Sequence, residues 1–255
     1  MNIIVLMAGR AKRFVDAGYV IPKPLIEIGH KTILEHTTRS FPYIVHYPEN
    51  KKQPPYVNLV FACLSEHKKF GMEDHLHTVY GNNIQLVWFD EITRGNLETA
   101  FITINKMGLM DYDELIILDS DNKYDNNGLA DEIAQELIGD RIMLCGFRDE
   151  QLIPKWANAI VDKNHNVIDI VEKDPAHVTD PALVGVFGFG NTKLFKRYAK
   201  YILENIGTTY GNEYYMSSIP KMHARLGLPV WLHEVKGVVP MGTPEDVEAL
   251  HDIHV

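Results

Sequence analysis

The stretch that decides the fold is residues 3–13, which read IIVLMAGRAKR. An uninterrupted apolar run from Ile3 to Met7 leads directly into a turn of small residues that carries three cations. Such a run is typical of a strand covered on both faces, as in a parallel sheet. The backbone N–H groups of a small-residue turn and nearby basic side chains bind phosphate oxygens. The turn therefore predicts a phosphate site, although by itself it is equally compatible with a tight loop bearing a solvated basic edge.

The same strand pattern recurs along the first part of the chain. Further apolar runs occupy residues 58–63, 84–89, 114–118 and 142–147. Helix-compatible patterns lie between most of them, at residues 33–40, 66–80 and 96–107. Strands that alternate with helices predict an α/β fold with a doubly wound sheet, whose ligands bind at the carboxyl ends of the strands.

The second half has a different pattern. It predicts a hairpin over residues 159–171, strands at 183–189 and 229–235, and helices at 193–205, 217–225 and 244–251. Thr243 is expected to cap the last helix together with Asp246, three residues on. The chain contains no linker-like or low-complexity segment, so we expect a single domain over residues 1–255.

Composition narrows the class of protein. The chain of 255 residues has 25 Lys and Arg against 34 Asp and Glu, a formal charge of −9, which argues against a nucleic-acid partner. No apolar stretch approaches the roughly 20 residues of a membrane span, so we expect no membrane partner and a cytoplasmic location. The two cysteines, Cys63 and Cys145, lie in apolar stretches and are interpreted as buried thiols.

Two further segments carry residues suited to phosphate chemistry. Lys23 lies between Pro22 and Pro24, whose rigidity can aim an ammonium at a developing negative charge. Asp119 and Asp121 follow directly after a predicted strand, where carboxylates suit Mg²⁺ or Mn²⁺. The alternatives are a surface lysine in a proline-rich loop, and Asp side chains that cap a turn.

Taken together and in this order, these segments resemble the nucleotidyltransferases that activate sugar 1-phosphates. Residues 93–100, 171–173, 184–187 and 242–246 extend the resemblance over most of the chain. It implies a Rossmann-like three-layer α/β/α sandwich with a mixed, mostly parallel central sheet, of the nucleotide-diphospho-sugar transferase or GT-A type. Residues 1–125 would form the nucleotide-binding half and residues 126–255 the acceptor-binding half.

The resemblance also implies roles for individual residues. Arg13, Lys23 and Asp121 would be catalytic, acting on the phosphates of an entering NTP. The nucleotide would be held by Met7, Ala8, Gly9, Arg10, Ala11, Lys12, Thr93, Gly95 and Ser120. The phosphate-bearing acceptor would contact Lys155, Glu172, Lys173 and Gly185. Asp121 and Asp119 would bind the metal ion, Mg²⁺ or Mn²⁺.

Two positions depart from the family pattern. Ala11 occupies the place of a second glycine in the phosphate loop. Residues 239–241 contain no carboxylate where the family often has a second metal-binding aspartate. Either one metal ion suffices, or Glu213 supplies the missing ligand.

The function expected is therefore metal-dependent nucleotidyl transfer from an NTP to a sugar 1-phosphate or similar metabolite, with release of pyrophosphate. We expect this reaction to serve the synthesis of sugar nucleotides, such as those used for cell-surface polysaccharides. Two alternatives stay open: a glycosyltransferase of the same fold that consumes a nucleotide sugar, and a nucleotide sensor without catalysis. The base, the acceptor and the oligomeric state, a homo-oligomer included, are not determined by the sequence.

Overall fold

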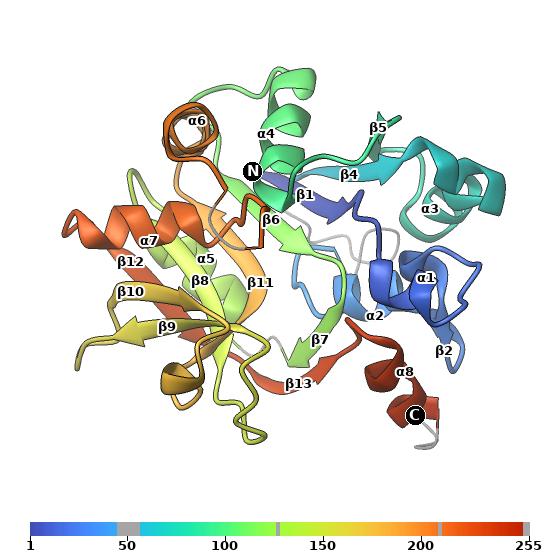
Figure 1. The fold of residues 1–255 in the computed structure, drawn as a ribbon. Helices are drawn as coiled ribbons and strands as arrows, with labels where there is room; N and C mark the ends of the chain where they lie inside the picture. The colour runs from blue at the N-terminus through green and yellow to red at the C-terminus, as the bar shows by residue number, and fades with distance from the viewer. Residues whose placement is uncertain (45–56, 126–127, 209–210, 252–255) are drawn as a thin grey trace.

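The central feature of the fold is one large mixed sheet (Figure 1). The computed structural model of the protein describes residues 1–44, 57–125, 128–208 and 211–251. Within these ranges nine strands join in one sheet, with β10-β9-β11-β6-β1-β4-β5 in order and with β8 and β12 continuing from β11. Their bounds are β1 Asn2–Met7, β4 Asn58–Leu64, β5 Gln85–Phe89, β6 Leu115–Asp119, β8 Ile142–Phe147, β9 Ala157–Val161, β10 Val167–Glu172, β11 Ala182–Phe189 and β12 Val230–Glu234.

The sheet is mostly parallel, because only β10 and β11 of these described strands run against the others. Strands β5, β4, β1 and β6 form a continuous parallel block, with Leu6 of β1 paired to Ala62 and Asp119. Strand β11 then pairs antiparallel with β6 and with β8. The expected fold class is thus confirmed. The parallel block brings the carboxyl ends of β1 and β6 to the same edge.

Helices cover both faces of the sheet, as the buried side chains of β1 show. Ile4 and Leu6 pack in a core with residues of α4 (Asn96–Met107), α6 (Thr192–Tyr201) and α7 (Ser218–Arg225). Ile3 and Val5 point to the opposite core, which contains residues of α2 (Ile33–Arg39), α3 (Met72–Tyr80) and α5 (Leu129–Glu136). The alternation of β1 between two cores gives the three layers predicted from its continuous apolar run.

Short elements complete the chain. They are α1 Lys12–Asp16, β2 Glu27–Ile28, β3 Lys31–Thr32, β7 Asn122–Asp125, β13 Lys236–Pro240, α8 Pro244–His251, the 3₁₀ turns Lys23–Leu25, Ser65–Phe70 and Pro175–His177, and a π-helical turn at Ile202–Ile206. The helix predicted at residues 66–80 is divided at Gly71, whose φ of 75° ends the 3₁₀ turn and starts α3. No helix in the described ranges is both long enough and apolar enough to cross a membrane.

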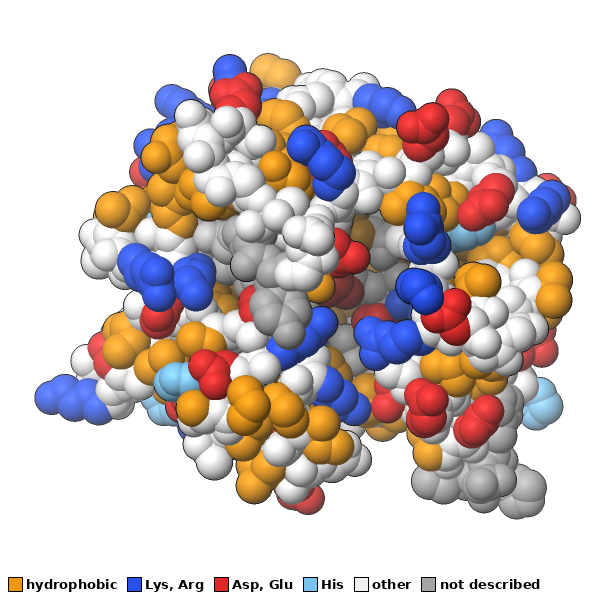
Figure 2. Space-filling view, in the orientation of Figure 1, with side chains coloured by type: hydrophobic (Ala, Val, Ile, Leu, Met, Phe, Trp, Pro, Cys, Tyr) orange, Lys and Arg blue, Asp and Glu red, His pale blue; other side chains and the backbone are white. Residues whose placement is uncertain are grey.

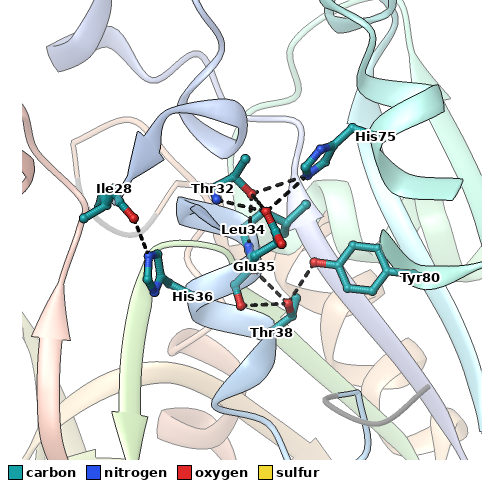
Figure 3. A network of polar contacts seen from close by, with 8 residues as sticks. All are labelled: Ile28, Thr32, Leu34, Glu35, His36, Thr38, His75 and Tyr80. Carbon is teal, nitrogen blue, oxygen red and sulfur yellow. Dashed lines mark hydrogen bonds and ion pairs between the residues drawn. The ribbon is translucent and has the colours of Figure 1, made fainter. Parts of the chain in front are cut away.

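A network of polar contacts fixes α2 beside α3 and the β2–β3 hairpin (Figure 3). Thr32 and Glu35 form a reciprocal capping box at the start of α2, and His75 of α3 lies 3.4 Å from the Thr32 hydroxyl. The hydroxyls of Thr38 and Tyr80 are 2.8 Å apart and buried. Because the β2–β3 hairpin follows Lys23 directly, this network supports the segment that carries that lysine.

A small apolar cluster joins the two ends of the chain. Phe14 of α1, Ile28 of β2 and Ile33 of α2 pack with Met241 and with Val247 of α8. The C-terminal helix is thereby held against the elements that carry Arg13 and Lys23.

Candidate active site

A cavity of about 320 Å³ lies beyond the carboxyl end of β6. Figure 2 shows the hollow near the middle of this face, with acidic side chains inside it and Lys and Arg side chains around it. Its lining contains the predicted residues Arg13, Asp119, Asp121, Lys155, Glu172, Lys173, Gly185 and Glu213. Residues predicted from separate motifs in both halves of the chain therefore face one cavity.

The phosphate turn leads from β1 into α1. Ala11, the N-cap of α1, has φ 46° and ψ 42°, a left-handed conformation that costs an alanine about 1–2 kcal/mol. The backbone N–H groups of Phe14 and Val15 donate to the Ala11 carbonyl at 2.9 and 3.2 Å, which helps to hold this shape. The alanine thus holds a left-handed backbone form that a glycine adopts without this strain.

The cations of this turn have different surroundings. Arg13 lines the cavity, whereas the exposed Lys12 forms an ion pair with Asp16 one helical turn away. Gly9 and Arg10 are exposed, and no atom lies within 4 Å of a Cβ added to Gly9. Met7, Ala8 and Ser120 are buried. The nucleotide-binding roles expected for these residues stay predictions.

Lys23 is aimed at the carboxylate of Asp121. Its Nζ donates to Asp121 Oδ2 at 2.8 Å, and the two side chains are 18% and 26% exposed. Pro22 and Pro24 frame the single 3₁₀ turn that starts at Lys23, and the Leu25 N–H closes it on the Pro22 carbonyl at 2.8 Å. The rigid backbone fixes the start of the Lys23 side chain, and the hydrogen bond to Asp121 holds its ammonium.

Two carboxylates occupy the end of β6. Asp119 is its last residue, and Asp121 lies in the turn before β7. Burial and the neighbouring Asp121 carboxylate raise the pKa of Asp119 to about 7, although Lys23 and a hydrogen bond from Asn96 oppose this rise. Asn122 Nδ2 donates to Asp121 Oδ1 at 3.2 Å and so helps to orient that carboxylate.

This donor set suits a hard divalent cation. Mg²⁺ in phosphate-transfer sites commonly takes one or two carboxylates, and substrate phosphates and waters complete its shell. Burial is the main cause of the raised pKa of Asp119, and the Asp121 carboxylate adds to it, so a cation bound here would relieve the repulsion between the two carboxylates. Among the described residues no group of three Asp, Glu, His or Cys side chains could share one ion. The metal-binding roles of Asp119, Asp121 and Glu213 stay predictions.

The residues predicted to contact the acceptor begin where the β9–β10 hairpin reaches the cavity. Glu172 ends β10 and accepts a hydrogen bond from the Ser217 hydroxyl. Burial raises the pKa of Glu172, although the bond from Ser217 and the nearby lysines oppose the rise. Lys173 has φ 50°, its N–H donates to the Trp156 carbonyl at 2.8 Å, and its Nζ lies 5.6 Å from the centre of the Tyr215 ring.

Gly185 of β11 explains how strand and carboxylate approach so closely. Its φ is 80°, and a Cβ built there would lie 2.6 Å from Asp119 Oδ2. A side chain at this position would strain the backbone and displace the carboxylate. The structure thus places the predicted acceptor glycine directly against the predicted metal site.

Thr93 and Gly95 brace the segment that closes the cavity. The Thr93 hydroxyl donates to the Gly95 carbonyl at 3.0 Å. Gly95 has φ 140°, and a Cβ there would collide with the backbone of Tyr214. The Tyr214 N–H donates to the Arg94 carbonyl at 2.8 Å, so residues 94–97 fasten the segment before Ser217. The nucleotide role expected for Thr93 and Gly95 stays a prediction beside this structural one.

Sequence reasoning assigned no individual site role to several residues of the cavity wall: Asn96, Asn122, Tyr215, Ser217 and Asp246. Asn96 accepts from the Met216 N–H at 2.9 Å and donates to Asp119 Oδ1 at 3.4 Å, so it links the two sides of the site. Its position directly after Thr93-Arg94-Gly95 could have identified Asn96 as a site residue from the sequence. Ser217 and Tyr215 had no such signal, because their contacts depend on how distant segments pack.

The comparisons with known proteins agree with this geometry. The family model for nucleotidyl transferases matches residues 2–213, and no curated protein gives a significant match. A nucleoside-diphosphate-sugar pyrophosphorylase from Vibrio cholerae has a similar structure, with a TM-score of 0.79, 20% identity, and coverage of 99% of this chain and 100% of that one. The inositol-1-phosphate CTP transferase from T. maritima has a TM-score of 0.70, 16% identity, and coverage of 98% and 94%.

At these identities the two structures establish similarity of fold, whereas the family model spans residues 2–213, most of the sequence. That range contains part of the cavity lining, Arg13, Asp119, Asp121 and Lys173 among it. The chain belongs to the nucleotidyl transferase family.

Proposed function

We propose that the protein transfers a nucleotidyl group from an NTP to a phosphate-bearing metabolite, a sugar 1-phosphate or a related polyol phosphate, and releases pyrophosphate. One observation carries the proposal: Arg13, Lys23 and Asp121 line or border the same cavity as Lys155, Lys173 and Glu172. A reaction between two phosphates needs cations for each of them within one enclosed space.

The nucleotide side would bind the triphosphate and stabilise its transition state. Arg13 at the start of α1 and Lys23 beside Asp121 can donate charge-assisted hydrogen bonds to phosphate oxygens. A bound Mg²⁺ or Mn²⁺, held by Asp121 with Asp119 in support, would neutralise charge on the triphosphate. Lys23 would then turn from Asp121 to the α-phosphate, where negative charge grows during attack.

The acceptor side would hold the nucleophile. Lys155 and Lys173 would bind the acceptor phosphate, and Glu172 would accept hydrogen bonds from hydroxyl groups of the acceptor. An oxygen of that phosphate forms a bond to the α-phosphorus, and the bond from the α-phosphorus to the bridging oxygen breaks. Pyrophosphate carries away the electron pair, so the step needs no covalent enzyme intermediate.

The relatives suggest acceptors for the first assay. The similar structures are named for a nucleoside-diphosphate-sugar and for inositol 1-phosphate, so sugar 1-phosphates and inositol 1-phosphate lead the panel. Phosphocholine and phosphorylated amino acids complete it. Each is combined with each NTP and Mg²⁺, and release of pyrophosphate is measured.

The outcomes separate the candidate functions. Pyrophosphate release that depends on both substrates, and stops when the divalent cation is chelated, supports the proposal. Hydrolysis or transfer of a nucleotide sugar without pyrophosphate release would indicate a glycosyltransferase. Nucleotide binding without any turnover would indicate a sensor. A cytoplasmic location also stays a prediction, which cell fractionation would test.

A further inference from the structure

The site contains a second lysine–aspartate pair that repeats the arrangement of the first. Lys23 follows Ile21-Pro22 and pairs with Asp121. Lys155 follows Ile153-Pro154, and its Nζ lies 3.4 Å from Asp246 Oδ1. The side chains of Lys155 and Asp246 are 28% and 16% exposed, so this pair is as sheltered as the first.

The position of Asp246 is unexpected for a site that binds phosphate. Asp246 lines the cavity together with Lys155 and Lys173. A carboxylate there repels an incoming phosphate. A favourable effect of the carboxylate on a neighbouring group would have to compensate for this repulsion. Among the described residues, the partner of Asp246 Oδ1 is the Lys155 ammonium.

The second oxygen of Asp246 is fixed by the capping box of α8. The Thr243 N–H donates to Asp246 Oδ2 at 3.0 Å, and the Asp246 N–H donates to the Thr243 hydroxyl at 3.1 Å. This confirms the cap predicted from the sequence. With one oxygen held by the helix start, the other is left in a fixed direction toward Lys155.

Gly242 brings the two lysine–aspartate pairs together. A Cβ added at Gly242 would lie 3.2 Å from Asp121 Oδ2 and 4.0 Å from Asp246 Oδ2. The Met241 N–H also donates to the Asp121 carbonyl at 2.8 Å. The turn before α8 is thus tied to the nucleotide side while Asp246 reaches the acceptor side.

We propose that Asp246 is a positioning residue that holds the Lys155 ammonium in place to bind the phosphate of the acceptor. This inference rests on the proposed function, because it assigns Lys155 to the attacking phosphate. Lys155 is a long side chain with several rotatable bonds, and its Nζ lies 5.1 Å from the centre of the Trp156 ring. The aromatic ring and the carboxylate together restrict it, which lowers the entropy lost when phosphate binds.

The decisive variant is Asp246→Asn, because an amide oxygen can still cap the helix but carries no charge for Lys155. We expect the KM for the acceptor to rise about tenfold, with the KM for the NTP within about twofold. Glu248→Gln is the matched control, since it removes one negative charge from an exposed position of the same helix. It should change neither constant.

A double-mutant comparison tests whether Asp246 acts through Lys155. Lys155→Met should raise the acceptor KM at least as much, and adding Asp246→Asn to it should cause no further loss. Independent, additive losses would overturn the proposal. A lower acceptor KM in Asp246→Asn would also overturn it, since the carboxylate would then compete with the acceptor.

Binding of inorganic phosphate gives a readout that does not need turnover. In calorimetric titrations, Asp246→Asn and Lys155→Met should weaken the affinity for inorganic phosphate by a similar factor, and Glu248→Gln should leave that affinity unchanged. If no substrate pair releases pyrophosphate but this pattern holds, the proposed reaction fails while the positioning role stands. If Asp246→Asn binds phosphate as the wild type does, the positioning role fails whatever the reaction.

Discussion

The two sides proposed for the cavity, the nucleotide side and the acceptor side, are built in different ways. The nucleotide side uses three short motifs: the turn after β1, the 3₁₀ turn that starts at Lys23, and the two aspartates at the end of β6. The acceptor side collects residues from β9, β10, β11, the segment before α7 and the start of α8. The conformation of a short motif is set by residues close to it in the sequence. The shape of a wall made of several segments depends on all the contacts between those segments.

The difference predicts how each side fails. Changes on the nucleotide side should remove chemistry and leave the fold intact, because its functional side chains project from a rigid edge. Changes on the acceptor side should affect substrate binding and stability together, since the same residues hold the segments in place.

The largest effect is expected for Asp121→Asn. This change removes the carboxylate that pairs with Lys23 and is proposed to hold the cation, so kcat should fall on the order of 1,000-fold. The melting temperature should change little. Steady-state pyrophosphate release measures the first quantity and thermal denaturation the second. Asp125→Asn, at an exposed position at the end of β7, is the control. A fall in kcat of less than about tenfold would show that Asp121 has no catalytic role.

Gly185→Ala should have the next largest effect, and mainly on stability. The left-handed backbone and the approach of Asp119 Oδ2 to 2.6 Å together should destabilise the protein by about 3 kcal/mol or more. Gly227→Ala is a matched control, because Gly227 has φ 73° with no atom within 4 Å of an added Cβ. It should cost only the backbone strain of about 1 kcal/mol. Equal losses in denaturant unfolding would contradict the contact with Asp119.

Lys173→Met should act on the acceptor alone. It removes a cation beside Glu172 while keeping an unbranched apolar chain against Tyr215. The KM for the acceptor should rise about tenfold and the KM for the NTP should stay within about twofold. If both constants rise together, the lysine serves the nucleotide as well, and the division between the two sides is wrong at this residue.

The smallest effect is expected away from the cavity, where α7 packs on β10. Arg225 donates to Asp169 at 2.9 and 2.7 Å. Burial alone would raise the pKa of Asp169, but the bonds from Arg225 and the Ile170 N–H outweigh it and lower that pKa. Arg225 is 58% exposed, so solvent screens the pair and its contribution is about 0.5 kcal/mol.

The sign of the pH dependence follows from the lowered pKa of Asp169. The stabilisation is complete above the ordinary carboxyl pKa of about 4 and is lost as the pH falls through the lower native value. Arg225→Gln should therefore be less stable than the wild type at pH 7, and the difference should shrink on acidification. Urea unfolding of both proteins at pH 7 and at an acidic pH measures this difference in the free energy of unfolding. A difference that grows at low pH would rule out the ion pair as its cause.

The strands of the fold differ in how well the sequence predicts them. The strands at residues 142–147 and 183–189 were placed almost to the residue, because long apolar runs mark buried strands. The short strands β2, β3 and β7 were not predicted, since two to four residues give too little periodicity, and neither was β13, whose five residues are exposed or half-buried and form no buried run. The order of the sheet, with β11 inserted between β6 and β8, was not predicted either.

The same limit applies to the site. Arg13, Lys23 and Asp121 were found because each belongs to a motif whose backbone geometry is local. Asn96, Ser217 and Asp246 were missed as site residues because each acts through a partner more than 20 residues away: Asp119, Glu172 and Lys155. Nothing in a single sequence pairs such residues. Ala11 was identified as a departure from the sequence, but only the structure shows that it has a left-handed φ of 46°.

The sequence by itself determined the α/β class, the strand-end position of the aspartates and the resemblance to nucleotide-activating enzymes. These depend on hydrophobic periodicity and on motifs spanning a few residues, which act over one or two elements. The tertiary structure decided which residues share the cavity, how Gly185 meets Asp119, and that Lys155 and Asp246 form a second pair. Those contacts arise only when antiparallel strands and the last helix pack against the parallel block, because packing, unlike periodicity, is a property of the whole chain.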